Sequence, residues 1–193
     1  MTDKKDIIKK HQDIIKRRDI KDGLISILEQ TVDQRVERYL EIDHQGIVGS
    51  HYFAKASSEC IDLYRDGYYI SAVMVSQAVN EGILKFIAES NGIEKKAYDV
   101  LLDEFMQKSI MTSGCVQASK EILGSFRNDV HHMNPKVAKI PFQQLARKNL
   151  KNLATIEKEI FGTDFNNGEL VPHHPKYWDI QKGGTVPVFL RLG

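Results

Sequence analysis

Cysteine, proline and tryptophan are scarce in this sequence, with two, five and one among its 193 residues. Cys60 and Cys115 lie far apart, and neither forms a C-x-x-C pair, so a disulfide framework and a zinc site both lack support. Both cysteines fall on apolar helical faces, where a free, buried thiol is the usual outcome. We therefore predict two unpaired thiols and no bound metal.

An excess of charge of one sign is also missing, because 27 lysine and arginine residues are matched by 26 acidic ones. A chain with a net charge of +1 has no overall field that would gather nucleic acid. This balance disfavours a protein that coats nucleic acid. Any contact with RNA must come from a local patch.

Long apolar runs are absent as well. The longest, Tyr68 to Val75, includes a serine and is too short to span a bilayer. The first ten residues, MTDKKDIIKK, are charged throughout and contain no apolar stretch of signal-peptide length. We expect a cytoplasmic protein that has no membrane partner.

Helical periodicity dominates what is present. The length suits one well-buried domain, and an apolar fraction of 41% is ordinary for a soluble protein. Strand-forming segments are scarce before residue 162 and no glycine-rich phosphate loop occurs, which disfavours an α/β nucleotide-binding fold. We predict an all-α protein: an antiparallel helical bundle of about five helices over residues 46–161, an N-terminal helical extension over 1–45 and an irregular C-terminal tail over 162–193.

The N-terminal extension is highly charged but periodic. Ile7, Ile8, Ile14 and Ile15 repeat at a seven-residue spacing and form an apolar stripe. Gly23 interrupts the pattern, and two helices or one helix bent at Gly23 fit equally well. A stripe of this kind typically packs against another chain or against its own protein, and we favour packing over attachment to a membrane.

Within the bundle, the segment 68–88 is apolar around most of its circumference and should be the most buried helix. Its polar residues, Glu81 among them, then need partners. The helix before it is predicted to begin with Ser50 as its N-cap, and the helix that Thr112 or Ser113 caps to continue through Phe126 into the Arg127 run. Two further helices are expected over 97–110 and 142–160. In the tail, the TVPVFLRL end forms a short strand or an extended arm.

One run of residues has the composition of a catalytic site: Arg127-Asn128-Asp129-Val130-His131-His132. Arg127 and His131 are four positions apart and share a helical face, while His132 lies about 100° further round. Arginine presents a permanently charged fork that matches phosphate oxygens, and histidine exchanges a proton near neutral pH. Attack by a ribose 2′-hydroxyl would need no metal and would exclude DNA.

A purely structural role of the same run competes with this reading. Arginine and histidine near a helix end satisfy the last carbonyl groups and the helix dipole. Asp129 could hold either histidine in place. The pair His173-His174 lies in a proline-flanked loop without an acidic or cysteine companion, which is typical of solvated side chains.

The run resembles the hallmark of the HEPN superfamily (higher eukaryotes and prokaryotes nucleotide-binding domains), which is an arginine, usually a polar residue next, and a histidine after four to six intervening positions. Arg127, Asn128 and His132 match it. The preceding segment, GYYISAVMVSQAVNEGILKFI, resembles the long second helix of such bundles, where an aromatic-rich start leads to an acidic residue, here Glu81. The resemblance covers about residues 50 to 160.

The resemblance implies a helical bundle that forms a homodimer and brings two copies of the motif into one cleft. Many members are similar to metal-independent endoribonucleases of defence, toxin–antitoxin or RNA-processing systems. On this analogy His132 is the acid or base, Arg127 steadies the phosphate and Asn128 orients one of them. The resemblance implies RNA as the partner and no cofactor. His131, Asp129 and Glu81 are possible assisting residues.

Two other functions stay open. Some members of the superfamily lack catalysis and bind a nucleotide or a protein, and such a module would use the same Arg127 surface without turnover. The chain would alternatively be an antitoxin or a structural subunit, whose N-terminal stripe docks on a protein partner.

Overall fold

The computed structural model describes residues 4–180 and 187–191, and these residues are mostly α-helical. The elements follow one another along the chain as α1 (Lys4–Leu40), β1 (Ile47–Gly49), α2 (Ala54–Arg65), α3 (Tyr69–Ser90), α4 (Tyr98–Gln107), α5 (Ser113–Leu123), α6 (Arg127–His131), α7 (Phe142–Phe161), β2 (Thr163–Asn166), β3 (Glu169–Pro172) and β4 (Val188–Leu190). Short 3₁₀ turns cover Pro135–Lys139 and Pro175–Tyr177.

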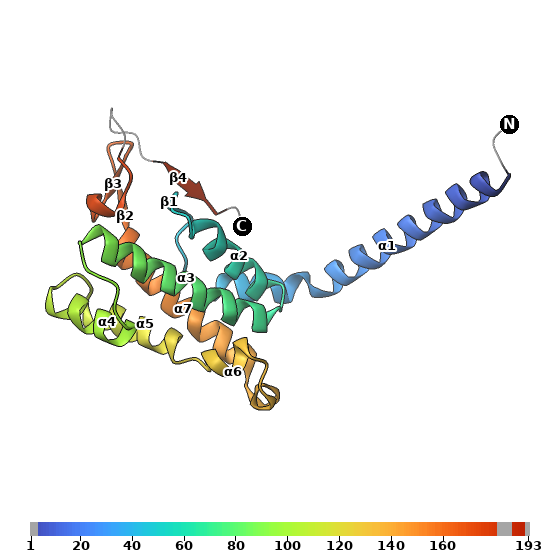
Figure 1. Ribbon diagram of the computed structural model, residues 1–193. Coiled ribbons are helices and arrows are strands. Elements are labelled where there is room, and N and C mark those ends of the chain that lie inside the picture. Colours follow the sequence, from blue (N-terminus) through green and yellow to red (C-terminus); the bar gives the residue numbers. More distant parts are fainter. Residues whose placement is uncertain (1–3, 181–186, 192–193) are drawn as a thin grey trace.

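The N-terminal extension is one helix rather than two, because α1 runs through Gly23 without a break. At 1.5 Å per residue its 37 residues span about 55 Å. Figure 1 shows α1 extending away from the remaining elements, which gather into one mass that we call the body. The last turns of α1 contact the body at the end of α2, through Arg35 and Arg38.

Helix α3 lies at the centre of the body and packs against α2, α5 and α7, as its apolar sequence predicted. Its length and hydropathy are enough for a helix that crosses a membrane, yet 56% of its most apolar window is buried inside the body. The core helix of a soluble protein has the same properties.

Two apolar clusters make up the core. The larger one gathers side chains of α3, α4, α5 and α7 and extends to Tyr177 and Trp178 of the tail. The smaller one joins α2, α3 and α7 and includes Val130 of α6. Both predicted free cysteines, Cys60 and Cys115, are buried and unpaired.

The tail contains more regular structure than predicted. Strands β2 and β3 form an antiparallel hairpin, which turns at Asn167 and Gly168 with positive φ angles of 50° and 84°. Strand β4 pairs with β1 in antiparallel register, with Val48 opposite Phe189. A strand in the TVPVFLRL segment is therefore confirmed for residues 188–190; residues 185, 186 and 192 lie outside the described residues.

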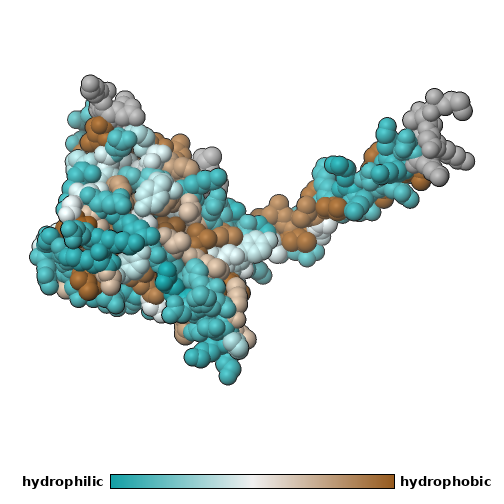
Figure 2. Space-filling model, in the orientation of Figure 1, coloured by the Kyte–Doolittle hydropathy of each residue, from teal (hydrophilic) through white to brown (hydrophobic). Residues whose placement is uncertain are grey.

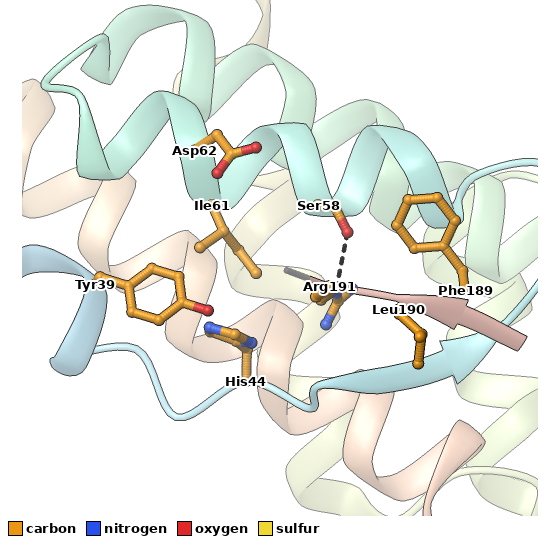
Figure 3. Close-up of a pocket in the computed structure, with 8 residues that line it drawn as sticks. All are labelled: Tyr39, His44, Ser58, Ile61, Asp62, Phe189, Leu190 and Arg191. Carbon is orange, nitrogen blue, oxygen red and sulfur yellow. Dashed lines mark hydrogen bonds between the residues drawn. The ribbon is translucent and has the colours of Figure 1, made fainter. Parts of the chain in front are cut away.

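A buried ion pair fastens the end of the tail to the body. The Arg191 guanidinium donates to the Glu157 carboxylate of α7 over 2.8 Å, and their side chains are only 3% and 4% exposed. The same guanidinium donates to both Ser57 and Ser58 of α2. Figure 3 shows Arg191 between the strand and α2, with its bond to Ser58.

Some predicted helix boundaries were wrong. Helix α2 begins at Ala54 after Phe53, so Ser50 is not its N-cap. Helix α5 stops at Leu123, and Phe126 adopts a left-handed backbone with φ of 54°, so the predicted continuous helix into the Arg127 run is interrupted. Thr112 caps α5 as predicted, since its hydroxyl accepts from the Cys115 amide.

Candidate active site

The predicted site lies on α6, a helix of five residues that begins at Arg127 and ends at His131, with His132 as its C-cap. Val130 is fully buried in the smaller apolar cluster and anchors this short helix to the body. Phe126, which precedes α6, and Met133, which follows its C-cap, both have positive φ angles, 54° and 49°. Left-handed backbone at non-glycine residues is costly and gathers at functional sites, so it draws attention to the segment that it brackets.

Two residues of α6 contact two residues of α3. The Nε of Arg127 lies 2.8 Å from Oε1 of Glu81, and the Nε2 of His131 lies 3.1 Å from Oε1 of Gln77. The two residues are four positions apart in each helix, and the later residue of α6 meets the earlier residue of α3. The two helices therefore run in opposite directions along this contact. The predicted shared face of Arg127 and His131 is therefore the face that α6 turns to α3.

Glu81 uses both carboxylate oxygens. One accepts from Arg127, and the other accepts from the hydroxyl of Tyr98 at 2.9 Å. Burial of the phenol, together with the hydrogen bond to Glu81 and its negative charge, raises the pKa of Tyr98 to about 12. Glu81 is thus a positioning residue, which holds Arg127 on one side and Tyr98 on the other.

Arg127 keeps part of its charge at the surface. Its side chain is 47% exposed, whereas that of Glu81 is 14% exposed. The ion pair is made through Nε, so Glu81 of α3 orients the guanidinium. The side chain is half-exposed, so solvent still reaches this group. An arginine held in this way is suited to a phosphate oxygen.

The two neighbouring histidines differ in their surroundings. His131 is held by Gln77, whose Oε1 can only accept, so the shared proton sits on Nε2 of His131. The side chain of His132 is exposed, and no hydrogen bond joins its ring to another residue in the described part of the chain. The histidine at the spacing of the HEPN hallmark is therefore the free one.

A buried polar network holds Gln77 in turn. Its amide nitrogen donates to the backbone oxygen and to the hydroxyl of Ser125, both at 2.9 Å. The amide of Asn149 on α7 donates to the same hydroxyl at 3.0 Å and to Ser76 at 3.1 Å. Gln77 and Ser76 of α3 therefore have the partners that buried polar residues need, as predicted. The same contacts connect α3, α6 and α7.

The other predicted site residues play smaller parts. Asn128 is exposed at the start of α6. Asp129 accepts from the side chain of Asn134 at 3.0 Å, so it fastens the turn after α6 rather than either histidine. Sequence reasoning missed Tyr98, Ser125 and Asn149; the signal for Asn149 was an uncharged polar residue on the apolar face of the last helix.

No group of three histidine, cysteine or acidic residues is arranged to hold a metal ion within residues 4–180 and 187–191. A cavity of about 210 Å³ opens between the end of α1, α2 and β4, lined among others by Tyr39, His44 and Asp62 (Figure 3). None of the predicted site residues lines it. Arg191, which also lines the cavity, already donates hydrogen bonds to Glu157, Ser57 and Ser58.

The geometry at α6 thus offers an oriented, half-exposed arginine and an exposed histidine five positions later, supported by a buried polar network. Comparison with known proteins adds no relative: no protein-family model matches the chain, and no curated protein or solved structure is significantly similar to it.

Proposed function

We propose that this protein is a HEPN-type endoribonuclease that cleaves RNA without a metal ion. The observation that carries the proposal is the difference in hydrogen bonding between the two histidines. Both rings are exposed, but His131 is hydrogen-bonded to Gln77, while His132, at the spacing of the hallmark, makes no hydrogen bond within the described residues and follows by five positions an arginine oriented by Glu81.

In the proposed reaction the ribose 2′-oxygen attacks the adjacent phosphorus and the 5′-oxygen leaves. The products are a 2′,3′-cyclic phosphate and a 5′-hydroxyl end. His132 takes the proton from the 2′-hydroxyl or gives one to the leaving oxygen. Arg127 neutralises charge on the non-bridging oxygens, and Asn128 orients one of these groups.

The proposal includes a quaternary arrangement. One motif supplies one exposed imidazole that makes no hydrogen bond within the described residues, His132, and the reaction needs one group to accept a proton and another to donate one. A homodimer of antiparallel helical bundles, with the two motifs facing one cleft, would supply both. A cytoplasmic defence or toxin-like system, restrained by an antitoxin or other protein partner, is the setting that the resemblance suggests.

Cleavage of a mixed-sequence RNA in the presence of a chelator tests the proposal. We expect the wild-type protein to cut RNA but not the same sequence as DNA. We expect His132→Ala to abolish cutting while the circular dichroism spectrum is unchanged. His174→Ala, at an exposed ring in the tail, is the matched control and should retain cleavage. Unchanged cleavage by His132→Ala would refute the proposal.

One observation favours a second candidate, a non-catalytic module that binds a nucleotide or a protein. Arg127 already has an anionic partner in Glu81, as an arginine with a structural role would have. For such a module, the wild-type protein would bind a nucleotide, Arg127→Ala would lose that binding, and no RNA would be cut at any protein concentration.

A further inference from the structure

Helix α1 exposes large apolar side chains along most of its length. Figure 2 shows them as brown patches on the arm that leaves the body. An exposed apolar surface of this extent is typical of a protein–protein contact. Each of the following is at least 39% exposed: Ile8, Ile14, Ile15, Ile20, Leu24, Ile25, Ile27, Leu28, Val32, Val36 and Leu40.

The described part of the body does not cover these side chains, because α1 docks through Arg35, Arg38 and the half-buried Tyr39. Arg35 forms an ion pair with Asp66 at 2.8 Å, and Arg38 donates to the backbone oxygen of Arg65 at 3.0 Å. In the same turns, Val36 and Leu40 remain 48% and 70% exposed. Val36 and Leu40 are therefore left uncovered by the described part of the chain even where the helix touches the body, whereas Tyr39 is half-buried against the smaller apolar cluster.

Gly23 lies in the middle of this helix. Glycine is the least favourable residue for a helix interior apart from proline. A Cβ atom at Gly23 would meet nothing within 4 Å, so no contact of the described chain needs its small size. A second helix that crosses closely at this point supplies a reason for the glycine.

The charges of α1 are divided between its two halves. Residues 4–22 contain eight lysine and arginine residues against four aspartates. The second half, residues 23–40, contains three acidic residues, Glu29, Asp33 and Glu37, against two arginines, of which Arg35 is paired with Asp66. Two parallel copies would repel each other at their basic halves, whereas two antiparallel copies bring basic and acidic halves together.

We propose that α1 pairs with α1 of a second copy of this chain in antiparallel orientation, with the crossing at Gly23 and Leu24. The apolar positions suit this register, because Ile20 and Leu28 are equally far from Leu24 and lie on the same face of the helix. The contact covers a strip about 50 Å long and about 10 Å wide on each helix. A strip of this size is of the same order as the roughly 800 Å² per partner of stable complexes.

This pairing does not depend on chemistry at Arg127, and its tests contain no cleavage readout. It is also separate from the dimer contact proposed above, which joins the α6 motifs. A failure of the arm pairing would therefore leave the nuclease proposal standing, and the converse also holds.

The mass of the full-length protein in solution is the first test, measured by light scattering after gel filtration. We expect a Leu24→Glu/Leu28→Glu variant to have half the mass of its parent, with the body still folded by near-ultraviolet circular dichroism. The wild-type protein serves as the parent, because the α6 contact is then the same in both proteins and only the α1 contact differs. Gln30→Glu adds the same kind of charge on the other side of α1 and should leave the mass unchanged.

Disulfide trapping in the full-length protein determines the direction. Cys60 and Cys115 are buried, and burial raises the pKa of both thiols, so they do not compete with cysteines placed on the arm. We expect an Ile20→Cys/Leu28→Cys double variant to form a covalent dimer on oxidation. Ile20→Cys alone should stay uncrosslinked, because antiparallel pairing holds the two positions 20 about 12 Å apart along the helix axis.

Three results would overturn the proposal. A monomeric parent, including one that sediments with anionic lipid vesicles, would show that α1 serves another partner. An unchanged mass in the double-glutamate variant would place the dimer contact elsewhere. Rapid crosslinking of Ile20→Cys alone would mean that the helices pair in parallel.

Discussion

The Nε of Arg127 lies 2.8 Å from Oε1 of Glu81, and this ion pair joins α6, the shortest α-helix among the described residues, to the central helix α3. Four residues away on each helix, His131 and Gln77 repeat the contact. The pairing leaves His132 outside the contact surface. It thereby separates a residue that holds the motif in place from one that is available to a substrate.

Glu81→Gln tests how the carboxylate acts on its two partners. Loss of its negative charge should lower the pKa of Tyr98 from about 12, although burial keeps the value above the usual 10. Alkaline titration of tyrosine absorbance, with Tyr98→Phe as the reference that lacks this group, measures the change. In the same variant, RNA cleavage should fall because Arg127 loses its orienting partner. A Tyr98 titration identical to that of the wild type would contradict the assigned contact.

Gln77→Leu should destabilise the protein by about 1–3 kcal/mol, because Ser125 and His131 lose a buried hydrogen-bond partner. Urea unfolding followed by circular dichroism measures the difference. Gln117→Leu on the exposed side of α5 is the matched control, and it should change stability by no more than about 0.5 kcal/mol. Equal effects of both substitutions would argue against the network.

Arg191→Met should cost about 3–5 kcal/mol, because it leaves the Glu157 carboxylate buried without its partner. The double variant Arg191→Met/Glu157→Leu should recover most of this loss, since it removes both charges together. Arg147→Met, which breaks a half-exposed pair with Glu41, is expected to cost at most about 1 kcal/mol. A double variant as unstable as Arg191→Met would show that the ion pair is not the source of the effect.

His51 should make stability depend on pH. Its ring packs among Phe53, Phe86 and Phe161, and burial there lowers its pKa below the usual 6.5. The Tyr177 carbonyl and the charge of Asp179 raise the pKa, but by less. The unfolded chain then binds this proton more readily, so stability decreases as the pH falls below about 6.5 and through the folded pKa.

The His51→Phe variant should lose this part of the pH dependence. Unfolding by urea at pH 7.5 and pH 5.5 in both proteins provides the comparison. His174→Phe, at an exposed ring in the tail, is the control and should behave like the wild type. A wild-type and a His51→Phe protein with the same difference between the two pH values would contradict the prediction.

Local sequence determined the helices and the motif. The apolar periodicity of residues 68–88 identified the central helix, because a segment that is apolar on most sides has to be buried. The spacing of Arg127, His131 and His132 placed the first two on one face and the third to the side, which follows from 100° per residue. These properties depend only on neighbours along one helix, so no tertiary information was needed.

Only the tertiary structure decided which partners those faces meet. Nothing in the local pattern pairs Arg127 with Glu81, or Gln77 with Ser125, because these contacts depend on how α6 lies across α3. The break at Phe126 and the anchoring of Arg191 likewise come from packing between distant segments. The physical reason is the same throughout: helical periodicity is local, whereas a buried charge or amide is satisfied by whichever group the fold brings within hydrogen-bonding distance.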